Sequence, residues 1–221
     1  MIRGIIFDFD GLILETEGPV YQSWVELFQE YGAELPFDVW STIIGTSDLE
    51  HFDPISMLEE KLGRKLDREA IAPRRHDREL ELVHQQPILP GVLEVIAEAR
   101  ELGLKMGIAS SSDREWVVGH LKRLGLYRHF GVIHTSDDVR RTKPDPELFI
   151  LALNSLGLKP AEAIVFEDSP NGISAAKSAG IFTVAVPNPL TRRLKVDHAD
   201  LRLDSLADLP LSDILSRANT S

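Results

Sequence analysis

The sequence predicts an α/β fold in which a parallel sheet carries an inserted helical domain. Short apolar runs recur along the chain, helical patterns separate most of them, and residues 15–87 interrupt this alternation with helical patterns alone. A chain of 221 residues is long enough for a main domain with a smaller insertion.

Five apolar runs predict short buried strands. They cover residues 2–7, 104–109, 131–135, 163–166 and 182–186. Strands that alternate with helices build a parallel sheet, and the carboxyl ends of its strands meet at one edge. We therefore expect the polar residues of a site to gather in the loops at that edge.

Helical spacing is clearest in two of the intervening segments. Residues 92–102 carry apolar side chains at helical intervals, and Gly103 stands where this helix would end. A second stripe at residues 148–155 predicts a helix that ends near Gly157.

The insertion begins with an amphipathic helix that Gly32 would end. Its stripe consists of Val20, Trp24, Leu27, Phe28 and Tyr31. We interpret this stripe as core packing, with contact to a substrate as the alternative. The prolines expected to punctuate the remaining helices are Pro36, Pro54, Pro73 and Pro87. The predicted domains are therefore 1–14 with 88–221 for the sheet, and 15–87 for the helices.

The charge of the chain favours a small-molecule partner. It has 24 basic and 35 acidic residues, a net charge of −11, which argues against binding to nucleic acid or to anionic membranes. An anionic substrate would then require a metal ion or local cations in the site.

Several kinds of site are excluded or disfavoured by composition. The absence of cysteine excludes disulfides, thiolate metal sites and a cysteine nucleophile. The seven histidines occur singly, without the spacing of metal ligands. No stretch approaches the roughly 20 apolar residues of a membrane span, so we expect a cytoplasmic protein, and a monomer.

Four polar pieces follow predicted strands or lie near one. They are Asp8-Phe9-Asp10-Gly11, Ser110 within residues 109–112, Lys143-Pro144, and Glu167-Asp168-Ser169. Each alone has an ordinary explanation as a strand end or a turn. Together they form a complete set for phosphoryl transfer, which depends mostly on positioning and charge stabilisation.

The chemistry assigns a role to each piece. Magnesium prefers oxygen ligands, which Asp8, Asp168 and Glu167 could supply. The ammonium of Lys143 would reduce the repulsion between a carboxylate nucleophile and a phosphate.

Two further side chains complete the set. Ser110 with nearby backbone N–H groups would bind phosphoryl oxygens. Asp10 would protonate the leaving oxygen and then activate water.

In this order the four pieces resemble the four motifs of the haloacid dehalogenase superfamily of phosphatases, and more closely its β-phosphoglucomutase-like branch. The residues that carry the resemblance are 8–14, 107–112, 143–146 and 166–169, followed by Asn171-Gly172. The resemblance spans nearly the whole chain.

The resemblance implies a Rossmann-like core, a helical cap inserted after the first strand, and a small phosphomonoester substrate. It implies Asp8 as nucleophile and Asp10 as general acid and base. The implied phosphoryl ligands are Ser110 and Lys143, with Gly11 and Ser111 beside them. The implied Mg²⁺ ligands are Asp8, the Asp10 carbonyl, Asp168 and Glu167.

Departures from the family pattern bear on the reaction. Glu15-Thr16 stands where many relatives have Asp-Ser or Asp-Thr, which we interpret as a tolerated hinge substitution. A mutase arginine would fall at Asp48 and a mutase cap histidine at Val20. Losing a bidentate phosphate donor disfavours a bound bisphosphate, so we expect hydrolysis of a sugar phosphate or similar ester, with a phosphosugar mutase as the alternative.

Other readings are weaker. The basic run at residues 74–78 is interpreted as a solvated helix face rather than a site for an anionic group, and Arg192-Arg193 likewise. A phospho-acceptor signalling module would be smaller and lack an inserted cap. A true dehalogenase would not need the second acid at Asp10.

Overall fold

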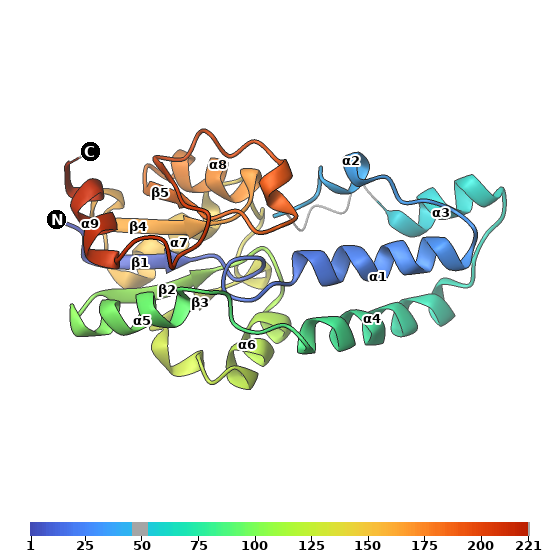
Figure 1. Cartoon of the computed structure of the whole chain (residues 1–221), viewed down its shortest axis with the longest axis horizontal. Helices are drawn as coiled ribbons and strands as arrows, with labels where there is room; N and C mark the ends of the chain where they lie inside the picture. Colours follow the sequence, from blue (N-terminus) through green and yellow to red (C-terminus); the bar gives the residue numbers. More distant parts are fainter. Residues whose placement is uncertain (46–52, 221) are drawn as a thin grey trace.

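The computed structural model describes residues 1–45 and 53–220, and its centre is a parallel sheet (Figure 1). Its strands are β1 (Gly4–Phe7), β2 (Lys105–Ala109), β3 (Val132–His134), β4 (Ala163–Glu167), β5 (Phe182–Ala185) and β6 (Leu201–Arg202). Their order across the sheet is β3-β2-β1-β4-β5-β6. The first five were predicted. The sixth has only two residues, too few for an alternating pattern to be recognised.

Helices fill most of the remaining chain. They are α1 (Glu17–Glu30), α2 (Phe37–Trp40), α3 (Pro54–Leu62), α4 (Arg68–His84), α5 (Val92–Glu101), α6 (Arg114–Arg123), α7 (Glu147–Leu156), α8 (Pro170–Ser178) and α9 (Leu211–Thr220). Both helices predicted beside the sheet, α5 and α7, are confirmed. Across residues 1–45 and 53–220, no helix has the length and apolar character needed to cross a membrane.

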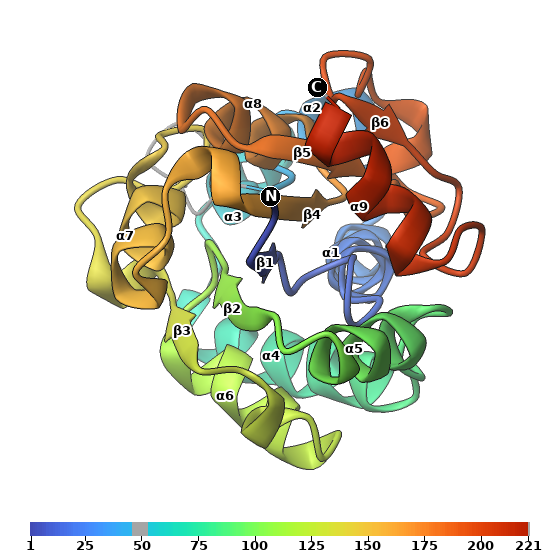
Figure 2. The same cartoon turned by 90° about the vertical axis from the view of Figure 1, so that its left-hand side faces the viewer.

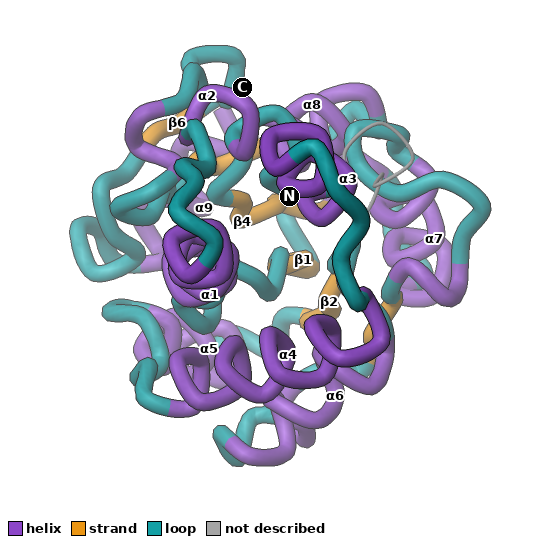
Figure 3. The backbone as a smooth tube through the Cα atoms, turned by 90° about the vertical axis from the view of Figure 1, so that its right-hand side faces the viewer, coloured by secondary structure: helices purple, strands orange, loops and turns teal. Residues whose placement is uncertain are grey.

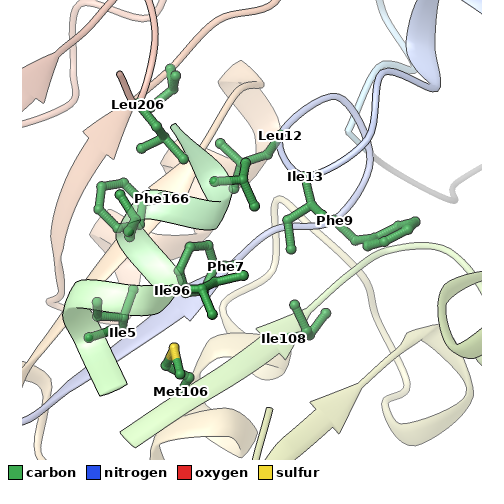
Figure 4. Packing of buried hydrophobic residues seen from close by; sticks show 14 of the residues in the cluster. Ile5, Phe7, Phe9, Leu12, Ile13, Ile96, Met106, Ile108, Phe166 and Leu206 are labelled. Carbon is green, nitrogen blue, oxygen red and sulfur yellow. The ribbon is translucent and has the colours of Figure 1, made fainter. Parts of the chain in front are cut away.

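Helices cover both faces of the sheet (Figure 2). On one face, Ile5 and Phe7 of β1 belong to the same apolar cluster as Ile96 of α5 (Figure 4). On the other face, Ile6 belongs to a cluster with Phe149 of α7. Successive strand residues point to opposite faces, so a strand buried on both is a continuous apolar run. The predicted α/β fold class is confirmed.

The register of the sheet brings the predicted site residues to one edge. Phe7 of β1 lies opposite Ile108 of β2 and Phe166 of β4. Because the strands are parallel, the residues that follow these three positions emerge together. Asp8 and Glu167 are therefore neighbours directly beyond the paired segment.

The helices α1 to α4 lie beyond this edge, and both chain termini lie at the opposite end of the molecule (Figure 1). The helices α1 and α4 run side by side (Figure 3), with Arg78 Nε 2.8 Å from Glu26 Oε2. Leu27 and Phe28 are buried in an apolar cluster that these helices largely build themselves. No described residue in the range 15–87 belongs to a strand, as predicted.

The apolar stripe on α1 divides between two environments. Leu27 and Phe28 are buried in the core of the helical insertion, as the packing interpretation predicted. Val20 and Trp24 pack against the same cluster and also line a cavity. Gly32, with a φ of +70°, follows the end of the helix, as expected for a glycine stop.

The expectation that Pro73 interrupts a helix is wrong, because α4 continues through it. The other three prolines lie at helix starts or beyond a helix end. Proline removes one backbone hydrogen bond from a helix interior. Tertiary contacts override this local cost: Ile71 is buried in the cluster of the insertion, and Arg78 pairs with α1.

Candidate active site

A cavity of about 460 Å³ opens between the carboxyl edge of the sheet and the inserted helices. Asp8, Asp10 and Ser110 line it from the sheet side, and Val20 and Trp24 line it from α1. The residues predicted as nucleophile, acid/base and phosphoryl ligand therefore face one volume.

Lys143 lies behind Asp8 and joins two strands of the site. Its Nζ donates to Asp8 Oδ1 at 2.5 Å and to Glu167 Oε1 at 2.6 Å, and it lies 5.0 Å from the ring centre of Phe149. The side chain is 1% exposed. Although burial disfavours the ammonium, the carboxylates of Asp8 and Glu167 raise the pKa of Lys143, so it stays charged.

Asp8, Glu167 and Asp168 form a buried acidic trio with oxygen atoms within 4.8 Å of one another. Burial raises the pKa of Asp8 to about 8, against the attraction of Lys143. Burial, and then the charges of Glu167 and Asp8, raise the pKa of Asp168 well above its ordinary value. Three carboxyl groups thus lie near one ammonium, which bonds to two of them. This excess of negative charge and the all-oxygen donors fit a hard divalent cation.

The trio contains three of the four predicted metal ligands. The carboxylate of the fourth, Asp10, is not part of it. The resemblance assigned the carbonyl oxygen of Asp10 to the metal, rather than its carboxylate.

Asn188 positions Asp168, a contact that was not predicted. Its Nδ2 donates to Asp168 Oδ2 at 2.7 Å and to the Gly11 carbonyl at 3.4 Å. Gly11 has a φ of +74°, and a Cβ there would lie 2.4 Å from Asn188 Nδ2. Gly11 is therefore required for the turn and its close approach, and it is not among the residues that line the cavity. The only signal for Asn188 was the Asn-Pro pair of a turn.

Four side chains donate hydrogen bonds to the carboxylate of Asp10. Thr16 Oγ1 and Trp116 Nε1 bond to Oδ1 at 2.9 and 2.8 Å. Ser112 Oγ and Ser110 Oγ bond to Oδ2 at 2.7 and 3.2 Å. The carboxylate is thus held at the cavity wall, away from the trio. No sequence motif pointed to Trp116, and Ser112 was visible only as a member of the serine run.

The two serines predicted to bind a phosphoryl group both line the cavity. Ser110 Oγ accepts from the backbone N–H of Ser112 at 3.1 Å. Ser111 Oγ donates to the carbonyl of Gly45 at 3.2 Å and so connects the sheet side to the insertion. Their role toward phosphate stays a prediction.

The two glutamates at the start of α1 have different surroundings. Glu15 precedes α1, and its Oε1 accepts from the N–H of Gly18 in the first turn of that helix at 2.9 Å. The helix dipole stabilises a carboxylate near the start of a helix. Glu15 is not a cavity residue. Glu17 does line the cavity, and burial, followed by the charges of Asp10 and Asp8, raises its pKa well above the ordinary value.

The basic run of α4 is partly a solvated face and partly a cavity wall. Arg78 pairs with Glu26 of α1. Arg75 and His76 line the cavity, but Arg75 Nη2 lies 2.8 Å from Glu79 Oε2 and its guanidinium lies 4.5 Å from the ring centre of Trp24.

A mutase would have a cap histidine at Val20 and a phosphate-binding arginine at Asp48. Val20 lies on the cavity wall. Asp48 lies outside the described residues. Arg193, weighed as a site for an anionic group, instead lies over the ring of Phe37, 3.7 Å from its centre.

Gly172→Ala is expected to destabilise the protein and weaken its binding of divalent metal. A Cβ at Gly172 would lie 1.8 Å from Oε1 of Glu167. Glu167 cannot move aside freely, because it is fully buried and bonded to Lys143. We expect a loss of about 1–3 kcal/mol in unfolding free energy, measured by denaturant unfolding, and a smaller thermal shift on addition of Mg²⁺.

Gly119→Ala is the matched control. Gly119 also lies within a helix, α6, but a Cβ there has no neighbour within 4 Å. This variant should be as stable as the parent or up to about 1 kcal/mol more stable. Equal stabilities and equal metal shifts for the two variants would contradict the assignment of Glu167 to the metal site.

Comparison with known proteins assigns the family. The sequence model of the haloacid dehalogenase-like hydrolase family matches residues 5–186. The chain is 46% identical over 220 residues to protein YhcW of Bacillus subtilis (strain 168), whose phosphatase name is provisional, with 100% of this chain and 99% of the relative covered. It is 32% identical over 184 residues to a "Phosphorylated carbohydrates phosphatase" of Thermotoga maritima, covering 81% of this chain and 82% of that protein.

Comparison with solved structures supports the same family. A crystal structure of β-phosphoglucomutase from Clostridium difficile matches with a TM-score of 0.79 and 27% identity, over 100% of this chain and 98% of that chain. The predicted resemblance is therefore confirmed. By fold, motifs and sequence similarity, the chain belongs to the haloacid dehalogenase-like hydrolase family.

Proposed function

We propose that the protein is a magnesium-dependent phosphatase that hydrolyses a small phosphomonoester through an aspartyl-phosphate on Asp8. One observation carries the proposal. Asp8 and Asp10 lie at the carboxyl end of β1 on the wall of one cavity, with Lys143 and the other two carboxyl groups of the acidic trio behind Asp8. The names of the phosphatase relatives support the same reaction class.

The first half-reaction is attack by a carboxylate oxygen of Asp8 on phosphorus. The new bond joins Asp8 to the phosphoryl group as the bond from phosphorus to the ester oxygen breaks. Asp10 gives its proton to that oxygen, so the alcohol leaves neutral. In the second half-reaction water attacks phosphorus, Asp10 takes a proton from the water, and inorganic phosphate leaves with Asp8 restored.

The charges of this chemistry are balanced by groups around Asp8. Lys143, Ser110 and Ser111 would bind the phosphoryl oxygens, helped by backbone N–H groups. Asp8, Glu167 and Asp168, with the Asp10 carbonyl, would hold Mg²⁺. When bound, Mg²⁺ reduces the repulsion between the nucleophile and the phosphate.

The inserted helices would act as a cap. We place the boundaries at residue 14 and residue 88, with residues 15–87 as the cap. Closure of these helices would exclude water and order the substrate. The protein is expected to act as a cytoplasmic monomer, with no nucleic acid or membrane partner.

Hydrolysis is preferred to mutase activity on grounds of charge. A mutase holds a bisphosphate, and so needs a second cation site in the cap. Among the described residues that line the cavity from the cap, the basic side chains are Arg75 and His76, and both lie against Glu79. Residues 46–52 contain one histidine, His51, and no lysine or arginine.

The direct test is phosphate release from a panel of phosphomonoesters, with Mg²⁺ and with excess chelator. We expect release that depends on the metal, and product analysis with a sugar 1-phosphate should give free sugar. An isomerised sugar phosphate as the main product would establish the mutase instead. If no ester releases phosphate and no sugar phosphate is isomerised, the result would count against both activities.

A further inference from the structure

All three tryptophans of the chain line the same cavity. The sequence contains only Trp24, Trp40 and Trp116, from α1, α2 and α6, and each contributes to the cavity wall. These residues come from both sides of the cavity, two from the cap and one from the sheet domain. A large aromatic surface in a binding cavity favours flat apolar ligands.

Trp116 places this surface beside the leaving group. Its Nε1 donates to Asp10 Oδ1 at 2.8 Å. The proposed function gives Asp10 contact with the ester oxygen, so the alcohol portion of the substrate must lie close to Trp116. The indole is itself fixed by edge-to-face packing on His120, with ring centres 4.4 Å apart.

On the cap side, the cavity wall carries two indole rings whose planes are inclined by 46° to each other. Trp24 and Trp40 lie with ring centres 6.5 Å apart, and the planar guanidinium of Arg75 lies over Trp24. Guanidinium planes stack on aromatic rings and on nucleobases. Ile44 and Pro54 extend the lining.

The polar side chains of the wall are largely bonded to one another. Thr16, Ser112 and Trp116 donate to Asp10, and Ser111 donates to a backbone carbonyl. A polyhydroxylated alcohol would compete with these bonds, at a cost for each group left unpaired.

The charges of the cavity disfavour an anionic leaving group. Glu17 and Glu79 face it from the cap, and Arg75 is paired with Glu79. A second phosphate or a carboxylate on the substrate would therefore meet carboxyl groups without a free cation among the described lining residues.

We propose that the substrate is a monophosphate ester whose alcohol carries an uncharged planar ring, such as a nucleoside or an arylmethanol. This inference rests on the proposed phosphatase activity and specifies its substrate class. The cavity of about 460 Å³ lies within the range of small-molecule sites. Stacking of one ring on aromatic side chains changes binding by about 5- to 150-fold.

The test compares esters that differ only in the ring. Uridine 5′-monophosphate is compared with ribose 5-phosphate, and benzyl phosphate with cyclohexylmethyl phosphate, so that each pair leaves from a primary alcohol. We expect kcat/KM to be at least about fivefold higher for the planar member of each pair. Equal or lower values for the planar members would overturn the inference while leaving the phosphatase activity established.

Variants locate the effect in the cavity. Trp24→Leu keeps apolar volume but removes the ring, and it should reduce the ratio of kcat/KM between uridine 5′-monophosphate and ribose 5-phosphate toward 1. Tyr127→Leu is the control, because Tyr127 is an exposed aromatic residue outside the cavity wall. Its ratio should equal that of the parent. If Trp24→Leu does not fold, the comparison of the paired esters on the parent protein still decides whether the substrate carries a planar ring.

Calorimetry separates this inference from the proposed function. If no ester releases phosphate, the phosphatase proposal fails. Binding of uridine 5′-monophosphate and ribose 5-phosphate to the parent protein is then measured directly. Binding at least about fivefold tighter for the nucleotide would support the planar-ring site on its own, and equal or absent binding would overturn it.

Discussion

Asp8→Asn is expected to abolish turnover while leaving the chain folded. Asparagine has nearly the shape of aspartate, but its amide cannot form the aspartyl-phosphate. We expect kcat to fall by a factor on the order of 10⁴ or more, the scale of loss for an essential nucleophile. Steady-state phosphate release and circular dichroism on the same preparation provide the measurement.

The same substitution should stabilise the metal-free protein. Asp8 is buried with Glu167 and Asp168, and the ammonium of Lys143 bonds to Asp8 and Glu167. Removing one carboxyl group lowers this repulsion and leaves the bond from Lys143 to Glu167 intact, so the melting temperature without metal should be unchanged or higher. The stabilisation that Mg²⁺ confers on the parent should shrink.

Asp113→Asn is the control for a carboxylate lost from the same cavity. Asp113 lines the cavity and its side chain accepts from the N–H of Trp116 at the start of α6, a role that asparagine can also fill. Its activity should stay within about a factor of 10 of the parent, below the scale of a lost catalytic group. Comparable losses for both variants would contradict a unique role for Asp8.

The sheet and the polar residues at its edge were predictable because they follow from local pattern and simple topology. The apolar runs are short, those of β1 and β4 are buried throughout, and parallel strands place their carboxyl ends together. Asp8, Ser110 and Glu167 follow such runs directly. Their gathering at one edge therefore needs no knowledge of side-chain packing.

The partners of these residues were not predictable by the same reasoning. Trp116 reaches Asp10 only because α6 packs at a particular angle on the sheet, and Asn188 reaches Asp168 from a loop 20 residues away. Such contacts depend on tertiary placement, which local spacing does not encode. The two-residue strand β6 was not predicted for a related reason, since it exists only through pairing with β5.

The prediction for Pro73 was wrong for the opposite reason: a local signal was present, and tertiary packing overrode it. A strong local preference predicted an interruption, but α4 gains more from packing on α1 than one missing backbone hydrogen bond costs.

The aromatic stripe of α1 shows a limit of periodicity. Helical spacing identified one face, yet Phe28 is buried in the cap core while Trp24 lies on the cavity.

Lys143→Met should be among the most destabilising single substitutions in the chain. The ammonium is 1% exposed and bonds to Asp8 and Glu167 at 2.5 and 2.6 Å. Methionine preserves much of the apolar stem but leaves buried carboxyl groups without a cation. Breaking a buried pair in this way costs about 3–5 kcal/mol, and protonation of Asp8, whose pKa burial raises to about 8, would relieve part of it.

The matched surface control is Lys177→Met. Lys177 Nζ lies 2.6 Å from Asp200 Oδ1, but the two side chains are 36% and 28% exposed. Water screens this pair, so its loss should cost about 0–1 kcal/mol. Chemical denaturation of both variants, with metal absent, compares the same chemical change in two environments.

A double variant tests whether the cost arises from unpaired charge. In Lys143→Met with Glu167→Gln, one carboxylate is neutralised together with the lost ammonium. If repulsion among Asp8, Glu167 and Asp168 is the cause, the double variant is more stable than Lys143→Met alone, with a coupling of about 0.5–3 kcal/mol. Additive losses would instead assign the role of Lys143 to packing against Phe149, and the electrostatic account of this site would fail.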